Sequence, residues 1–162
     1  MKNIIFILLT LLASTTVYSM DLTDTQVKNL VKNAQEARLK AYAPYSTYQV
    51  GAALLSEDGQ IIQGCNVENA SYGLTNCAER SAIFSAVSMG KKNFQAISVV
   101  TKDGGSPCGA CRQVINEFNP DMVVIIAKED GTVVAKKTLR ELLPEAFGPK
   151  NLQDTIECTP KK

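Results

Sequence analysis

Apolar residues at helical spacing mark the first element that the chain predicts. They recur every three or four residues, and the stripe consists of Val27, Leu30, Val31, Ala34 and Ala41. In front of the stripe, Thr23 and Gln26 have the spacing of a capping box, in which the two residues cap each other's backbone amide. Pro44 disfavours helical geometry at the residue before it, so the helix is predicted to end near Ala43.

Beyond Pro44 the pattern changes to short apolar runs that alternate with helical stripes. Strands are predicted at residues 48–56, 61–67, 94–101, 122–127 and 132–136. A hairpin turn is predicted at residues 57–59 and a polar loop at 69–75. Helices are predicted at residues 77–90, 108–118 and 139–143. This order predicts an α/β fold, a three-layer α/β/α sandwich around a mixed five-stranded sheet.

The first 19 residues differ from the rest of the chain. Lys2 is followed by an apolar run from Ile4 to Ala13 and then by small and polar residues up to Ser19, the order found in a secretory signal peptide. The run is short for a membrane span. Two interpretations stay open: export to the periplasm or the extracellular space after cleavage, or translation that starts at Met20. In both, the predicted domain is residues 20–162, with no membrane anchor after the leader is removed.

Composition narrows the range of functions. The length of 162 residues fits one domain, and 45% hydrophobic with 20% charged residues fits a packed soluble core. A formal net charge of +1 and the lack of a basic stripe argue against a nucleic-acid partner. The chain has no histidine, which excludes Ser-His-Asp and Cys-His catalytic schemes.

Two short stretches, each predicted to open a helix, carry the candidate chemistry. They contain Cys77, Glu79, Cys108 and Cys111. Helix starts of an α/β sheet gather at the carboxyl edge of the strands, where ligands bind. The partial positive charge of a helix N-terminus also lowers the pKa of a thiol. Three thiolates hold a tetrahedral zinc ion and leave one position open, which is the pattern of a catalytic site rather than of a structural one.

The same cysteines admit two other interpretations. Cys108-Gly109-Ala110-Cys111, taken alone, also fits a thiol-redox motif, but that interpretation leaves Cys77 and Glu79 unexplained. A structural zinc module needs a fourth protein ligand and has no use for Glu79. Cys65 is typical of a small buried hydrophobe, and no partner can be named for Cys158.

Zinc nucleobase deaminases have a signature that these residues fit: a first ligand, a Glu two residues later and then Pro-Cys-x-x-Cys. In such chemistry, zinc lowers the pKa of a bound water from about 15.7 to about 7–9. Glu79 takes the proton of the water, passes it to the ring nitrogen and later delivers a proton to the departing ammonia. Arg80 and Gln113 lie beside the ligands and are predicted to donate hydrogen bonds to the sulfurs, which offsets the weak Lewis acidity of a three-thiolate site.

From about residue 24 to 148 the chain resembles the small homotetrameric cytidine deaminases. The matching segments are Ala43–Ser46, Val50–Leu54, Gly64–Ala70, Cys77–Arg80, Pro107–Gln113 and Glu141–Pro144. The resemblance implies deamination of cytidine and 2′-deoxycytidine to uridine and 2′-deoxyuridine in pyrimidine salvage. It also implies one Zn²⁺ per subunit on Cys77, Cys108 and Cys111, with Glu79 as the proton shuttle. The leader is a departure, because the family usually works in the cytosol.

The resemblance further implies the contacts to a pyrimidine nucleoside. Asn66 and Glu68 match residues that hold the sugar 3′-hydroxyl, and Tyr48 matches an aromatic residue, commonly Phe, that packs on the nucleoside. Ala78 is expected to contact the base through its backbone. Phe147 matches an aromatic residue that is lent to a neighbouring subunit's pocket, so a homotetramer is expected.

A related enzyme that acts on another aminopyrimidine nucleoside, or on an aminopyrimidine antibiotic, is the competing interpretation. Such enzymes share the metal signature and differ in the residues that contact the sugar. Asn66 and Glu68 favour an ordinary nucleoside, although Glu68 alone would be interpreted as a solvated surface residue.

Overall fold

The computed structural model describes residues 22–152. The segment 1–19, on which the predicted signal peptide rests, and Cys158 lie outside these residues. Within residues 22–152, no helix is long and apolar enough to cross a membrane.

Five strands form one mixed sheet in the order β2-β1-β3-β4-β5. β1 is antiparallel to β2 and to β3, β3 is parallel to β4, and β4 is antiparallel to β5. The strands are β1 (Gly51–Ser56), β2 (Ile61–Cys65), β3 (Phe94–Thr101), β4 (Val123–Lys128) and β5 (Val133–Thr138).

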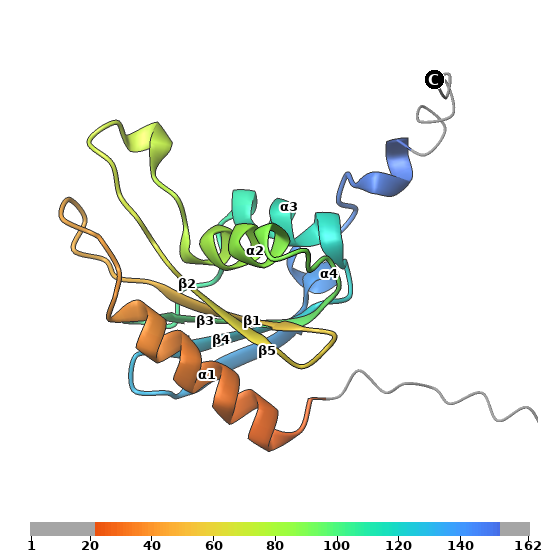
Figure 1. Ribbon diagram of the computed structural model, residues 1–162, viewed down its shortest axis with the longest axis horizontal. Coiled ribbons are helices and arrows are strands. Elements are labelled where there is room, and N and C mark those ends of the chain that lie inside the picture. The colour runs from red at the N-terminus through yellow and green to blue at the C-terminus, as the bar shows by residue number, and fades with distance from the viewer. Residues whose placement is uncertain (1–21, 153–162) are drawn as a thin grey trace, which may run out of the picture.

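Helices cover both faces of the sheet (Figure 1). They are α1 (Asp24–Arg38), α2 (Ala78–Ser88), α3 (Gly109–Phe118) and α4 (Leu139–Leu142), with 3-10 turns η1 (Tyr72–Leu74) and η2 (Pro149–Leu152). α1 lies on one face, and α2, α3 and α4 lie on the other. The predicted three-layer sandwich around a mixed five-stranded sheet is therefore confirmed.

Two hydrophobic clusters fill the spaces between the layers, because successive residues of a strand point to opposite faces of the sheet. Ala52 and Leu54 of β1 belong to the cluster under α2 and α3, whereas Ala53 and Leu55 belong to the cluster under α1. The central strands β3 and β4 are almost wholly buried, and β5 at the edge is mostly exposed. This burial agrees with the near-continuous apolar runs from which β3 and β4 were predicted.

α1 begins as predicted and ends early. Both hydrogen bonds of the capping box are present, but the helix ends at Arg38 rather than near Ala43. The reason is tertiary pairing with a distant segment. The Tyr42 N–H donates to Asn66 O at 3.0 Å, and the Glu68 N–H donates to Tyr42 O at 2.8 Å. The chain must therefore leave the helix before Tyr42 to make this pairing.

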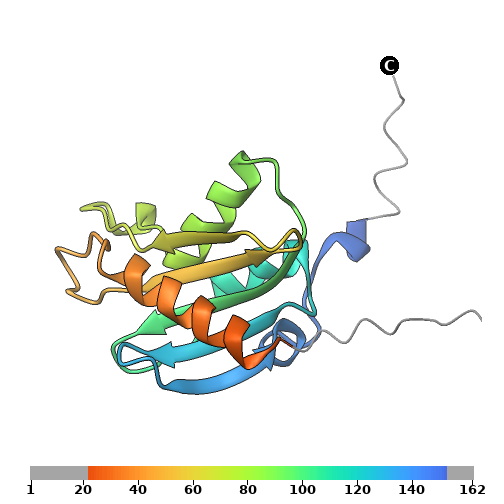
Figure 2. The same ribbon diagram turned by 60° about the horizontal axis from the view of Figure 1, so that its bottom comes forward.

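The opening hairpin is shorter than predicted, because a side chain replaces part of the ladder. β1 starts after Tyr48 and β2 stops before Val67. Between them, Asn66 Nδ2 donates to Tyr48 O at 2.9 Å, and Asn66 Oδ1 accepts from the Val50 N–H at 2.8 Å. The segments 42–50 and 66–76 consequently lie side by side, at one end of the sheet (Figures 1 and 2).

Candidate active site

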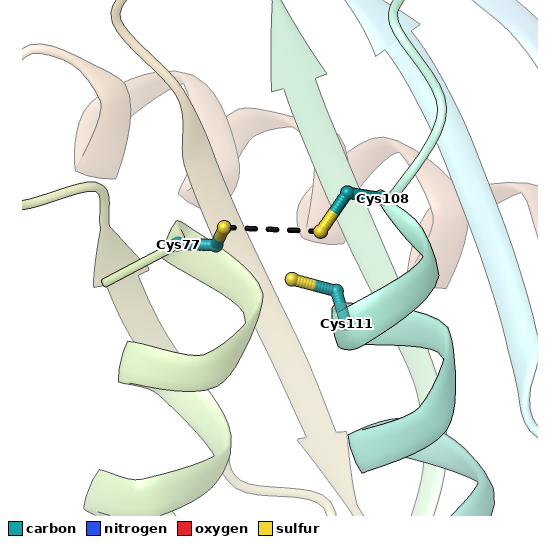
Figure 3. Close-up of side chains that lie close together, drawn as sticks. All are labelled: Cys77, Cys108 and Cys111. Carbon is teal, nitrogen blue, oxygen red and sulfur yellow. Dashed lines mark hydrogen bonds between the residues drawn. The ribbon is translucent and has the colours of Figure 1, made fainter. Parts of the chain in front are cut away.

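Three cysteines converge where α2 and α3 begin. Cys77 and Cys108 are the N-cap residues of α2 and α3, and neither side chain makes a capping hydrogen bond. Cys111 lies in the first turn of α3. The Sγ atoms of Cys77 and Cys108 are 4.0 Å apart, and all three sulfurs lie within 4.8 Å of one another. Figure 3 shows the three side chains directed at the space between the two helix starts.

This donor set fits a zinc ion. Zinc–sulfur bonds of about 2.3 Å in a tetrahedron place two sulfurs about 3.8 Å apart, close to the 4.0 Å between Cys77 and Cys108. The four cysteines within residues 22–152 are free thiols. The group has no fourth Cys, His, Asp or Glu among these residues. Three sulfurs and an open fourth position are the arrangement of a catalytic zinc site.

Negative charge is unevenly shared between Cys77 and Cys111. A hydrogen bond with Cys111, together with the Arg80 guanidinium, lowers the pKa of Cys77 to about 5. The hydrogen bond with Cys77 raises the pKa of Cys111, and burial and the negative charge of Glu79 raise it further. Negative charge is thus favoured on Cys77 rather than on Cys111.

Arg80 makes the kind of contact that the sequence predicts for it. Its Nη2 donates to Cys77 Sγ at 3.4 Å and to Thr75 O at 3.2 Å. Its Nε is buried and has no hydrogen-bond partner among residues 22–152. The guanidinium is therefore held between the loop before α2 and the Cys77 sulfur.

Glu79 is a buried carboxyl in the first turn of α2. Its exposed fraction is 4%. Burial raises the pKa of Glu79, and the negative charge of Cys77 also raises it. A carboxyl whose pKa is raised in this way is suited to take up and return a proton near neutral pH.

Glu68 is bound to the segment that precedes β1. It accepts hydrogen bonds from the backbone N–H of Tyr45 at 2.8 Å and of Ser46 at 3.2 Å, and from the Ser46 hydroxyl. The Ser46 hydroxyl is the largest cause of a lowered Glu68 pKa. Asn66, which is buried, also binds this segment through its amide nitrogen and its amide oxygen.

Tyr48 and Ala78 differ in their exposure to solvent. Tyr48 is 38% exposed, and its hydroxyl donates to Asp103 Oδ1 at 2.5 Å. Ala78 is the first residue of α2, and its side chain is fully buried. The Ala78 backbone shares this burial, and its contact with a base stays a prediction from the resemblance.

Gln113 binds a different group from the one predicted. Its Nε2 donates to Phe147 O at 2.7 Å rather than to a ligand sulfur, and Asn116 Nδ2 donates to the same oxygen at 3.1 Å. The Phe147 side chain is 60% exposed. Gln113 therefore fixes the backbone of Phe147, while the Phe147 ring remains largely exposed.

Sequence reasoning does not single out Arg112, although three hydrogen bonds converge on it. Its Nε donates to Pro107 O at 2.8 Å, its Nη1 to Leu142 O at 2.7 Å and its Nη2 to Ser106 Oγ at 2.8 Å. Arg112 thus ties the loop before α3 to the end of α4. The signal available in the sequence was its position directly after Cys111.

Comparison with known proteins agrees with this geometry. Residues 24–127 match the family model described as the cytidine and deoxycytidylate deaminase zinc-binding region. A cytidine deaminase from Sporosarcina psychrophila is 49% identical over 134 residues, 81% of this chain and 98% of the relative. One from Halalkalibacterium halodurans is 52% identical over 128 residues, 77% of this chain and 96% of the relative.

A solved structure agrees as well. The crystal structure of cytidine deaminase from Burkholderia pseudomallei has a TM-score of 0.72 and 49% sequence identity, and the match covers 78% of this chain and 100% of that one. The fold and the three-sulfur site are those of a zinc-dependent hydrolytic deaminase. The chain belongs to the cytidine and deoxycytidylate deaminase zinc-binding family, which confirms the resemblance found in the sequence.

Proposed function

We propose that this chain deaminates cytidine and 2′-deoxycytidine hydrolytically to uridine and 2′-deoxyuridine, as an enzyme of pyrimidine salvage. The observation that carries the proposal is the convergence of Cys77, Cys108 and Cys111 beside a buried Glu79 whose carboxyl interacts with Cys111. The similarity to bacterial cytidine deaminases over most of both chains supports the choice of substrate.

The three cysteines are proposed to hold one Zn²⁺ in each subunit. Zinc supplies Lewis acidity that makes a water molecule nucleophilic near neutral pH. The helix N-terminus at Cys77, together with the Arg80 guanidinium, favours the thiolate form of Cys77 that metal binding requires. The Arg80 bond to Cys77 Sγ withdraws charge from that sulfur.

Glu79 is proposed to move the protons of the reaction. It takes a proton from the attacking water and gives it to the ring nitrogen next to the attacked carbon. It then takes the second proton from the same oxygen, now bonded to the ring carbon, and delivers it to the amino group, which departs as ammonia while the carbonyl forms. Its burial keeps bulk water from the carboxyl and raises its pKa, so one group can act as base and then as acid.

The nucleoside is proposed to lie between the segments 42–50 and 66–76 and the start of α2. Asn66 and Glu68 are assigned to the sugar, the Tyr48 ring and the Ala78 backbone to the base. Phe147 is 60% exposed and is assigned to the pocket of a neighbouring subunit, which fits a homotetramer. No nucleic-acid partner is proposed.

The location of the protein is proposed from its first residues. Residues 1–19 are assigned as a signal peptide for export, and residues 20–162 as the deaminase domain. A start of translation at Met20 would instead leave the domain in the cytosol. Mass spectrometry of the native N-terminus, combined with cell fractionation, distinguishes the two.

Removal and return of the metal test the proposed reaction. Ultraviolet absorbance follows the loss of cytidine by purified residues 20–162 before zinc is stripped, after stripping, and after one equivalent is returned. We expect turnover to disappear on stripping and to recover on return, because without the metal the attacking water keeps its ordinary pKa of about 15.7.

Two results would contradict this proposal in different ways. A zinc-loaded chain that leaves cytidine and 2′-deoxycytidine unchanged would point to another aminopyrimidine substrate. A chain that binds no zinc and forms a reducible bond between Cys108 and Cys111 would support the thiol-redox interpretation.

Replacing Arg80 tests its effect on the metal site. Arg80→Ala is expected to weaken zinc binding by about 10- to 100-fold, because a hydrogen bond to a ligand sulfur is lost. Competition with a chromogenic chelator measures the affinity. Arg140→Ala is the matched control, since Arg140, which lies on α4, pairs with the exposed Asp121 and not with a cysteine. Unchanged zinc affinity and an unchanged rate in Arg80→Ala would refute the role.

A further inference from the structure

The Tyr48 hydroxyl joins two segments that are far apart in the sequence. It donates to Asp103 Oδ1 at 2.5 Å, across 55 residues of chain, a length found for hydroxyl-to-carboxylate bonds. The backbone of Tyr48 is itself held at both ends. Its N–H donates to Ser46 Oγ at 3.0 Å, and its carbonyl oxygen accepts from Asn66 Nδ2 at 2.9 Å. An anchored backbone thus places the phenol on the carboxylate.

Asp103 is also held by the strand that precedes it. Thr101, the last residue of β3, is 3% exposed and donates from Oγ1 to Asp103 Oδ1 at 3.1 Å. The Gly105 N–H donates to Thr101 Oγ1 at 2.6 Å. The hydroxyl of Tyr48, followed by that of Thr101, lowers the pKa of Asp103. The acceptor is therefore a carboxylate at neutral pH.

The loop after β3 is shaped around the phenol. A Cβ atom at Gly105 would lie 2.9 Å from the Tyr48 hydroxyl oxygen, closer than unbonded carbon and oxygen atoms normally approach. Any larger residue at position 105 would therefore have to displace the loop or the ring. Glycine at this position leaves the space that the hydroxyl fills.

The same loop leads to a proposed zinc ligand. Pro107 is fully buried and directly precedes Cys108. Arg112 holds this end of the loop through Pro107 O and Ser106 Oγ, at 2.8 Å each. The connection from β3 to α3 is thus fixed near its start by Tyr48 and near its end by Arg112.

We propose that Asp103 is a positioning residue of the deaminase site, because it ties the nucleoside-facing Tyr48 to the loop that ends at Cys108. The proposal rests on the proposed function, which takes Tyr48 to face the nucleoside and Cys108 to bind zinc. We name the bond between the two side chains the Tyr48–Asp103 brace. A phenylalanine at position 48 would keep the ring but lose the brace, so the hydroxyl has a role that the ring alone does not supply.

The test measures how Tyr48 affects the metal site and how Asp103 affects the binding of the nucleoside. Tyr48→Phe removes the hydroxyl, and we expect it to speed zinc release to a chelator about three- to tenfold, although Tyr48 is not a metal ligand. Asp103→Ala removes the acceptor, and we expect it to raise KM for cytidine by a similar factor, with kcat within about twofold. The double variant is expected to match the larger single effect, because both changes remove one bond.

Two further variants serve as controls. Asp58→Ala is matched to Asp103→Ala, because Asp58 also accepts a hydroxyl bond, from Ser56 Oγ at 2.5 Å. Asp58 follows Ser56 by two residues. Ser56 pairs with Phe94, the first residue of β3, so Asp58 lies at the opposite end of the sheet from the cysteines. Asp58→Ala is therefore expected to keep the KM and the zinc-release rate of the wild type. Asp103→Asn keeps a neutral acceptor and is expected to lie between wild type and Asp103→Ala.

Several outcomes would overturn the brace. One is zinc release from Tyr48→Phe at the wild-type rate. Another is a double variant in which the effects of the two single changes multiply. The third is an Asp103→Ala variant that loses kcat at unchanged KM. If Asp103→Ala fails to fold, Tyr48→Phe and Asp103→Asn carry the same comparison. A zinc-loaded wild type that does not turn over cytidine counts against the proposed function instead, and zinc release still decides the brace.

Discussion

Glu79→Gln is expected to lower kcat for cytidine by about 10²- to 10⁴-fold while zinc stays bound. Glutamine keeps the size and the polar end of the side chain but cannot exchange a proton. Because Cys77, Cys108 and Cys111 form the group of candidate metal ligands without Glu79, its replacement leaves the metal site complete. Steady-state kinetics measures the loss of kcat, and metal analysis of the same preparation measures whether zinc stays bound.

A glutamate of the same type at the surface provides the control. Glu57 lies in the exposed hairpin between β1 and β2, so Glu57→Gln changes charge by the same amount and is expected to keep the wild-type kcat. Loss of zinc together with activity in Glu79→Gln would make Glu79 a ligand. Wild-type turnover in Glu79→Gln would remove it from the mechanism.

The elements that local sequence patterns determine were predicted well. β3 spans Phe94–Thr101, as the apolar run indicated, and the capping box at the start of α1 is present. These features depend on neighbouring residues and on burial, which the pattern of apolar positions reports directly. The closeness of Cys108 and Cys111 is also a local feature, because the first turn of one helix brings the two residues together.

The features that long-range contacts determine were not predictable in the same way. The end of α1 depends on the pairing of Tyr42 with the segment 66–68, which local periodicity does not contain. Gln113 was assigned to a sulfur on account of its position in the motif, but its partner is the carbonyl of Phe147. The acceptor of the Tyr48 hydroxyl lies 55 residues away, and nothing near Asp103 in the sequence marks it.

Gly64→Ala is expected to destabilise the fold by about 3 kcal/mol and to lower zinc occupancy. A Cβ at Gly64 would lie 2.4 Å from both Ala78 O and Ala82 N. Both are backbone atoms of α2, which cannot rotate away as a side chain can, so α2 must move off β2. The displaced segment is the first turn of α2, which directly follows Cys77 and carries Glu79. Urea denaturation and metal analysis of the folded protein measure the two effects.

Gly51→Ala separates damage to the fold from damage to the metal site. A Cβ at Gly51 would lie 2.0 Å from Ala34 O and 2.4 Å from Arg38 N, which are backbone atoms of α1 on the opposite face of the sheet. We therefore expect a comparable loss of stability with full zinc occupancy in the folded fraction. Equal zinc loss in the two variants would show that metal binding follows overall stability. Selective loss in Gly64→Ala would show that the close packing of α2 on β2 sets the geometry of the three sulfurs.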